Sequence, residues 1–417
     1  MHHLFCILAL CFSLPVLAQS NTEVRPSTTN SNNSNYQLNT NSVPVVLDSV
    51  RYEVAPAGDQ LKQEKVVSGK NKTTAPSKKT EENREMELKE EARPAPVTDT
   101  QAPATLRMQE QFQSNQMNAS HQYSRRSASP VEQMNMDQSV QYYQKAVPES
   151  FETHFYTYLA GHYNVDLYPE LRAAAAIDGE NTEVKKQEAA YFIIMSETDS
   201  AVGKIRELID SEVISPGQLA YANDLLVSGQ ENSTIVMHGF DDMLSAYYVQ
   251  NNSGVRQDVE LLSLDFMQSH LYRSHWTNKD MVLPQTEMID TAYLAELCRL
   301  NADRTLQLSL TIPKDYFTGI KSELYPVGLT FQYSQTPVDN YTKNNALWMS
   351  EMRKELVHHP MNDSGDKWSP NYLLMMITLR KQLIELNELK RAEVLNQAIL
   401  ELGARNNAGT KVKKYTE

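Results

Sequence analysis

Cysteine is scarce in this sequence of 417 residues, which contains only Cys6, Cys11 and Cys298. The first two lie in an apolar N-terminal stretch that we expect to be removed, and a single remaining cysteine cannot form an intrachain disulfide. The helical, apolar surroundings of Cys298 predict a buried small side chain rather than a reactive thiol. We therefore expect a core that is held together by packing alone.

Long apolar runs and an excess of positive charge are also lacking. No stretch after residue 18 approaches the roughly 18 consecutive apolar residues of a membrane-spanning helix. The net charge of −13 disfavours nucleic acid as a partner. Walker loops, dinucleotide-binding fingerprints, HExxH, GxSxG and zinc-type cysteine pairs are all missing from the sequence. These shortages predict no transmembrane segment in the mature chain, no cofactor and no nucleic-acid partner.

The N-terminus predicts export. Residues 4–17 are apolar but too few to span a bilayer, and residues 16–18 supply a small-residue cleavage site. Cys11 follows apolar residues, where a lipid could be attached, but the bulky Leu10 before it disfavours lipidation. We expect residues 1–18 to be a signal peptide and the mature protein to be periplasmic or associated with the cell envelope.

Composition divides the rest of the chain into five segments. Residues 19–130 are rich first in Asn, Ser and Thr, then in charged residues, and then in Pro, Gln and Met, which predicts a long disordered linker. Residues 131–230 predict an α-helical, repeat-like region, residues 231–335 an α/β domain, residues 336–405 a C-terminal α-helical hairpin region and residues 406–417 a disordered tail.

Apolar residues at three- and four-residue spacing predict helices before the α/β domain. Residues 167–177 and 182–195 form a candidate hairpin around the turn at residues 178–181. The alanine run at residues 173–176 would permit a close helix approach, as in tetratricopeptide-type repeats. The pattern therefore favours tetratricopeptide-like hairpins, although too few for an independent solenoid.

One further helix has clear end signals. Ser215 is a candidate N-cap, Pro216 suits the first helical position, and Gln218 would complete a capping box. The pattern predicts that this helix ends at Gly229.

Short β-branched and apolar runs predict the strands of the α/β domain. Residues 234–237 and 259–264 flank a helical pattern at residues 241–250, which predicts a right-handed parallel crossover. Further elements are expected as strands at residues 305–311 and 327–333 and a helix at residues 314–324. The fold class predicted is an α/β core with a short parallel, Rossmann-like sheet, flanked by α-helical hairpins.

Three stretches of the predicted α/β domain carry a resemblance: residues 233–250, Gly254-Val255-Arg256-Gln257-Asp258-Val259 and residues 261–264. They resemble the soluble region that follows the transmembrane part of a bacterial membrane-protein family of unknown function. That family is related to C-type, lipid-linked-sugar glycosyltransferases. The likeness continues through Ile312-Pro313, Gly319, residues 328–331 and residues 371–402.

Two departures limit what this resemblance implies. No transmembrane part is found here, so the family's membrane chemistry does not carry over. Where the family has approximately Gly-Asp-Asn-Asp-Thr, residues 239–243 read Gly-Phe-Asp-Asp-Met. One acidic and two polar positions have changed, which puts a shared ligand in doubt.

The candidate binding residues are His238, Asp241 and Asp242, at the carboxyl end of the first predicted strand, and Asp265, at the carboxyl end of the second. Open α/β sheets bind ligands at this edge. Carboxylates and an imidazole could hold a hard divalent cation, or act as acid and base on a sugar or phosphate.

A structural interpretation of the same residues competes with this one. Asp241 and Asp242 would lie in the first turn of a helix, where carboxylates stabilise exposed amides and the helix dipole. Asp265 stands where an N-cap belongs. The pattern alone assigns no catalytic residue, and it leaves open whether a metal binds.

Two functions remain. The sequence favours a non-catalytic protein-interaction or scaffold module with an envelope protein as partner, because no catalytic motif is present. The alternative is a glycan-active or metal-assisted hydrolase or transferase that uses the acidic crevice, with a glycan as ligand.

Overall fold

The computed structural model describes residues 107–113, 115, 125–359, 367–406 and 408–416. The predicted signal peptide at residues 1–18 and most of the predicted linker lie outside the described residues. Within the described part, no helix is both long and apolar enough to cross a membrane.

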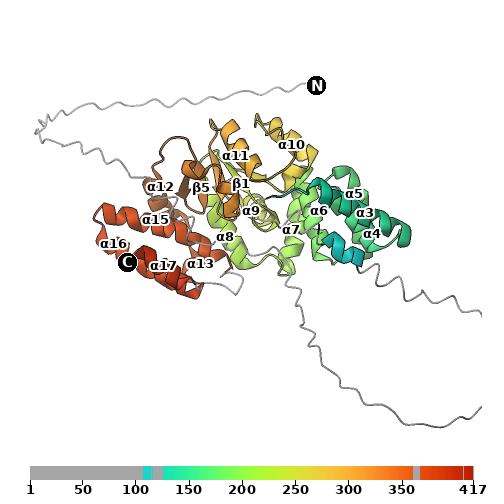
Figure 1. The fold of residues 1–417 in the computed structure, drawn as a ribbon. Coiled ribbons are helices and arrows are strands. Elements are labelled where there is room, and N and C mark those ends of the chain that lie inside the picture. The colour runs from blue at the N-terminus through green and yellow to red at the C-terminus, as the bar shows by residue number, and fades with distance from the viewer. Residues whose placement is uncertain (1–106, 114, 116–124, 360–366, 407, 417) are drawn as a thin grey trace, which may run out of the picture. The chain divides into compact units, whose positions relative to one another are not determined.

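A five-stranded mixed sheet has the strand order β2-β1-β3-β5-β4. Figure 1 labels two of its strands, β1 and β5, among the helices of the folded region. β2, β1 and β3 are parallel, whereas β5 is antiparallel to both β3 and β4. All residues of β1 and β3 are buried, as is typical of parallel strands that are covered on both faces. The strands are β1 (Thr234–Met237), β2 (Glu260–Ser263), β3 (Leu306–Ser309), β4 (Leu324–Val327) and β5 (Thr330–Tyr333).

The predicted strand-helix-strand unit is present. Helix α9 (Phe240–Ser253) connects β1 to its parallel neighbour β2. Gly254 follows the helix with φ +67°, the left-handed conformation in which glycine commonly ends a helix. The first strand has the predicted bounds, whereas the helix extends beyond residues 241–250 at both ends and the second strand is shorter than residues 259–264.

The strand predicted at residues 327–333 is instead a hairpin, so the expectation of a wholly parallel sheet was wrong. Gly328 has φ +58°, and a Cβ there would lie 2.2 Å from the Ser228 hydroxyl oxygen, so the chain can turn only with glycine. β4 lies at the sheet edge, where Pro326 is tolerated.

The helix predicted at residues 314–324 is also absent. Two short 3₁₀ turns, η4 (Lys314–Phe317) and η5 (Lys321–Glu323), lie in that stretch of the chain instead.

The helices predicted at residues 167–177 and 182–195 are present as α5 and α6, and the helix predicted from Ser215 is present as α8. The predicted hairpin is not the main pairing, and α7 was not predicted. α4 packs most closely with α5 and α6 with α7, while α5 and α6 share a smaller contact. The tetratricopeptide-like character of these hairpins therefore stays a prediction. The helices are α3 (Pro130–Ala146), α4 (Phe151–Ala160), α5 (Tyr168–Ile177), α6 (Thr182–Ile194), α7 (Thr198–Asp210) and α8 (Pro216–Val227), with the 3₁₀ turn η2 (Val165–Leu167) before α5.

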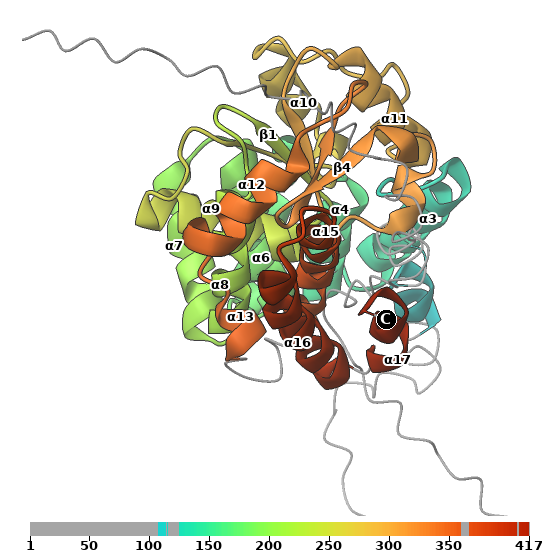
Figure 2. The same ribbon diagram turned by 90° about the vertical axis from the view of Figure 1, so that its left-hand side faces the viewer.

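The C-terminal helices include the predicted hairpin, formed by α15 and α16, which Figure 2 shows beside α12 and α13. α12 and α15 contact the edge strand β4. The remaining elements are η3 (Phe266–Gln268), α10 (His270–Thr277), α11 (Thr291–Leu300), α12 (Asn340–Ala346), the π-helix η6 (Leu347–Glu351), α13 (Glu355–His358), η7 (Ser369–Asn371), α15 (Tyr372–Glu385), α16 (Leu389–Arg405) and α17 (Gly409–Thr416).

The prediction of a disordered tail at residues 406–417 was wrong for most of that segment. α17 packs on α16, and the Val412 side chain is only 1% exposed. A Cβ at Gly403 would lie 2.8 Å from Val412, so the glycine permits this close approach. One buried valine among lysines was too weak a signal to reveal the contact in the sequence.

The boundary predicted at residue 130 was also too late. Residues 107–113 are helical, and Phe112 is fully buried with its ring stacked 4.2 Å from that of Tyr156. Phe112 belongs to a hydrophobic cluster with α3, α4 and α5, which is separate from the main core around the sheet. A lone aromatic residue in a polar segment gives no periodic signal, because its partners come from another part of the chain.

Candidate functional site

The four candidate side chains face different surroundings. His238 and Asp265 follow β1 and β2, and Asp241 and Asp242 lie in the first turn of α9, as predicted. They do not gather around one ligand position. Asp265 pairs with an arginine, Asp242 is tied to the end of β3, Asp241 borders a cavity, and His238 packs on a tyrosine.

Asp265 forms a two-pronged ion pair with Arg126. The Arg126 Nε donates to Asp265 Oδ1 at 2.9 Å, and a terminal guanidinium nitrogen lies 2.5 Å from Oδ2. The arginine and aspartate side chains are 9% and 3% exposed. Such paired hydrogen bonds between charged groups are strong and geometrically specific. Asp265 is therefore committed to a partner inside the protein, and it does not cap η3 through its side chain.

Residues 289–290 hold the segment that carries Arg126. The Arg126 amide donates to the Ile289 carbonyl at 2.6 Å, and the Ile289 amide donates to the Ser127 hydroxyl at 2.8 Å. Arg125 and Asp290 form an isolated antiparallel bridge, and the chain bends at residues 126–127. The segment is thus held along residues 289–290 by one backbone bridge and one side-chain hydroxyl.

The walls around the guanidinium are closely fitted. A Cβ at Gly239 would lie 3.2 Å from an Arg126 terminal nitrogen and 3.7 Å from Asp265 Oδ2. Tyr163, in the left-handed conformation with φ +63°, makes a side-chain hydrogen bond with Asp265. Burial, together with the nearby negative charge of Asp265, raises the pKa of Tyr163 well above its usual value. At this pKa the phenol is neutral near pH 7 and stabilises the carboxylate as a hydrogen-bond donor.

Asp242 combines the cap role with a buried tertiary contact. Its Oδ1 accepts from the Met243 amide at 3.0 Å and the Gly239 amide at 3.4 Å, and its Oδ2 accepts from the Thr311 hydroxyl. The residue is 4% exposed. Burial raises the pKa of its carboxyl to about 6, although the hydrogen bonds from Thr311 and Gly239 oppose the rise. These contacts favour the structural interpretation of this residue.

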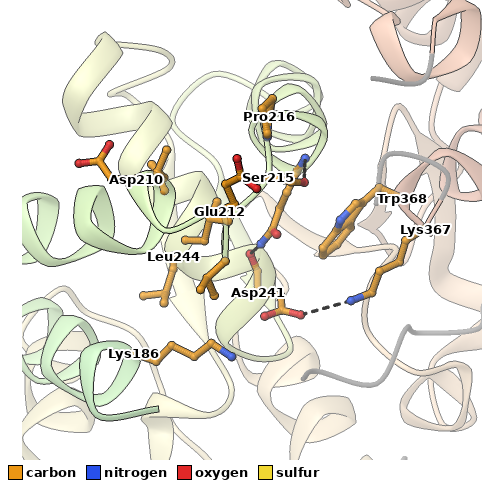
Figure 3. A pocket seen from close by; sticks show the side chains of 13 residues that line it. Lys186, Asp210, Glu212, Ser215, Pro216, Asp241, Leu244, Lys367 and Trp368 are labelled. Atoms are coloured by element: carbon orange, nitrogen blue, oxygen red, sulfur yellow. Dashed lines mark hydrogen bonds and ion pairs between the residues drawn. The ribbon is translucent and has the colours of Figure 1, made fainter. Parts of the chain in front are cut away.

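Asp241 points the other way, into a cavity of about 580 Å³ next to α8 (Figure 3). Its carboxylate lies 3.9 Å from the Lys367 ammonium. The carbonyl of Asp241 accepts from the Gln218 side chain at 2.6 Å. Gln218 therefore ties α8 to α9 instead of closing the predicted capping box, of which only the Ser215 half forms. Charged, polar and aromatic side chains line the cavity: Lys186, Asp210, Glu212, Gln218, Asp241, Lys367 and Trp368.

His238 is 9% exposed and meets the ring of Tyr316 edge-on at 5.4 Å. Among the described residues, no group of three or more His, Cys, Asp or Glu side chains could hold a metal ion. Cys298 is buried, which raises the pKa of its thiol to about 12 and fits the predicted inert side chain. The divalent-cation interpretation of the candidate residues thus gains no support from their positions.

Sequence reasoning missed Arg126, the residue that organises this edge of the sheet. It lies 139 residues before Asp265 and inside the segment predicted to be disordered. A possible signal was the Arg-Arg pair just before Ser129, which caps α3 and forms a capping box with Glu132. The capping box marks where ordered structure begins, but nothing local identifies the distant carboxylate.

No protein-family model, characterised protein or solved structure matches this chain. The resemblance to the glycosyltransferase-related family stays a prediction. The function must accordingly be argued from the geometry alone.

Replacing Asp242 by asparagine should change how stability depends on pH. The folded-state pKa of about 6 lies above the ordinary 3.8, so the folded state binds the proton more tightly, and ionisation of Asp242 destabilises the fold as the pH rises from about 4 to about 7. The asparagine side chain keeps an oxygen that accepts from the Gly239 and Met243 amides, and its NH₂ group can donate to the Thr311 hydroxyl. Because it does not ionise, it avoids the cost of burying a charge. As the pH rises across that range, we expect the free energy of unfolding of the variant to increase by on the order of 1–3 kcal/mol relative to that of wild type.

Urea unfolding of both proteins at pH 4 and pH 7.5 measures this difference. Asp339→Asn is the control. Hydrogen bonds from Thr342 lower the pKa of Asp339 below its ordinary value, so this carboxyl titrates below the tested range, and the stability difference between that variant and wild type should be nearly the same at pH 4 and pH 7.5. A variant-minus-wild-type difference at Asp242 that is independent of pH would contradict the prediction.

Proposed function

We propose that this chain is an exported protein of the cell envelope and that its folded region is a non-catalytic module that binds a protein partner. One observation carries the proposal. The carboxyl ends of parallel strands are where open α/β sheets bind ligands, and here that crevice holds the chain's own Arg126.

Two of the three candidate carboxylates are buried and hydrogen-bonded within the protein, which supports a non-catalytic function. A general acid or base must reach the proton that it transfers. Asp265 and Asp242 are 2% and 4% exposed, and both accept hydrogen bonds from within the protein. Asp241 is the exception, because it faces the cavity and its partner Lys367 is 3.9 Å away.

The cavity beside Asp241 supports a second candidate, glycan binding. It combines the Trp368 ring with carboxylates and ammonium groups, the kinds of side chain that contact sugar rings and hydroxyls. One face of Trp368 is already used by Tyr221, whose ring lies 5.0 Å away. This leaves less aromatic surface for a sugar, and we therefore rank protein binding first.

Crosslinking and affinity capture from intact cells test the proposed function. We expect the captured protein to begin at or near Gln19, as the cleavage site at residues 16–18 predicts, and to bring down a specific envelope protein. Tandem mass spectrometry identifies both in one experiment. Retention of the first eighteen residues would contradict export, and capture of a glycan without a protein would favour the second candidate.

A further inference from the structure

The segment at residues 125–127 is bound to the rest of the protein in the manner of a peptide ligand. Its backbone contacts residues 289–290, and its central side chain, that of Arg126, is buried against Asp265. None of the three residues belongs to either hydrophobic cluster. The contacts that hold the segment are polar and specific, so it can leave without removing an apolar side chain from the core.

We propose that this crevice is a recognition site for an arginine presented on a segment that docks along residues 289–290. Arg126 is its resident occupant, and a partner protein that presents an arginine in the same way takes its place. The inference rests on the proposed function, because it names the chemistry of the protein partner.

The pocket distinguishes arginine from other side chains. Asp265 offers both carboxylate oxygens to a planar, forked donor, which lysine cannot match with its single ammonium group. Gly239 leaves room for the terminal guanidinium nitrogen, and the hydrogen bond from Tyr163 stabilises the carboxylate. Gly239 and Asp265 follow β1 and β2, and both strands are fixed in the sheet. The site around the guanidinium therefore keeps its shape when one arginine replaces another.

Contacts with residues 289–290 add the second requirement, on the residues that flank the arginine. The Ile289 carbonyl accepts from the Arg126 amide, the Ile289 amide donates to the Ser127 hydroxyl, and Asp290 forms a backbone bridge with Arg125. A segment that carries a hydroxyl side chain directly after its arginine reproduces these contacts. The Tyr316 hydroxyl is buried beside the site and has no hydrogen-bond partner among the described residues, so a polar group of the incoming segment can bond to it.

Competition between the chain's own Arg126 segment and an incoming peptide sets the apparent affinity of the site for that peptide. A segment tethered to its own site acts at an effective concentration on the order of millimolar. A free peptide must compete with it, so binding to the wild-type chain is weakened by that internal occupant. Removing the Arg126 guanidinium should therefore expose the site to a peptide that supplies one.

Fluorescence anisotropy with the full mature chain tests this. The probe is a labelled peptide of residues 123–129, Tyr-Ser-Arg-Arg-Ser-Ala-Ser, and the matched control carries neutral citrulline in place of its second arginine. We expect Arg126→Ala to bind the arginine peptide at least tenfold more tightly than wild type does, and at least tenfold more tightly than it binds the citrulline peptide. Adding Asp265→Asn to that variant should abolish the preference.

Equal affinity of folded Arg126→Ala for the two peptides, or no binding of either, would overturn the proposal. If circular dichroism shows that Arg126→Ala does not fold, Arg126→Lys replaces it. That variant keeps the charge but loses the forked donor, and it should bind the arginine peptide more tightly than wild type, whereas affinity equal to that of wild type overturns the proposal. A partner captured from cells equally by wild type and Arg126→Ala, with no peptide binding, would leave the proposed function standing and refute this inference alone.

Discussion

Replacing Asp224 by alanine is expected to lower the free energy of unfolding by about 3–5 kcal/mol, because it leaves the Asn223 side-chain amide and three donors of the C-terminal region without their acceptor. Asp224 in α8 is fully buried. Its carboxylate accepts from the amides of Arg353 and Lys354 at 2.8 and 2.9 Å and from the Tyr372 hydroxyl at 2.8 Å. These bonds tie the C-terminal helices to α8.

The carboxylate also holds a strained turn in place. Lys354 has φ +57°, a conformation that is costly for a residue with a side chain. Loss of its amide bond to Asp224 should release the turn before α13 (Glu355–His358). Urea denaturation measures the loss, and proteolysis between Trp348 and Leu356 reports the released turn.

Asp339→Ala is the matched control. Asp339 is an exposed aspartate that accepts two hydrogen bonds from Thr342 at the start of α12. Removing a cap of this kind costs about 1 kcal/mol. A loss at Asp224 no larger than the loss at Asp339 would show that the buried carboxylate does not anchor the C-terminal helices.

The sequence predicted elements whose signals are local. Four consecutive β-branched or apolar residues mark β1, and the helical spacing over residues 241–250 marks most of α9. Ser215 and Pro216 begin α8 as expected, because capping needs only neighbouring residues. The parallel pairing of β1 and β2 also follows from local rules, since a helix between two strands implies a crossover.

Features that depend on distant partners could not be predicted in this way. The turn at Gly328 lies within residues 327–333, whose apolar and aromatic residues are typical of one strand, and only the closeness of Gly328 to Ser228 shows why the chain must turn there. Phe112 is ordered by Tyr156, which comes more than forty residues later. Neither contact produces a periodic pattern in the sequence.

The candidate site was predicted in position but not in arrangement. Asp241 and Asp242 are adjacent in the sequence, but successive residues on a helix point about 100° apart. One carboxylate therefore enters the cavity and the other packs on Thr311. The occupant of the crevice, Arg126, comes from a segment whose composition predicts disorder.

Replacing Asp265 by alanine is expected to lower the free energy of unfolding by about 3 kcal/mol. Breaking a buried ion pair costs about 3–5 kcal/mol when the remaining charge stays buried. Here part of the loss is recovered, because the segment at residues 125–127 can move Arg126 into water. The matched control is Asp258→Ala, which breaks a two-pronged pair with Arg256 whose side chains are 25% and 32% exposed. Solvent screening limits that loss to about 1 kcal/mol.

A local measurement separates release of the segment from general loss of stability. Trypsin cleaves after arginine only where the backbone is accessible, and the Arg126 amide is paired with the Ile289 carbonyl in the folded protein. In Asp265→Ala we expect cleavage after Arg126 to be at least tenfold faster than in wild type under conditions where both remain folded. Asp258→Ala should be cleaved there at the wild-type rate. If Asp265→Ala is destabilised but cleavage after Arg126 is unchanged, backbone pairing alone holds the segment, and the guanidinium pocket is not what keeps it in the crevice.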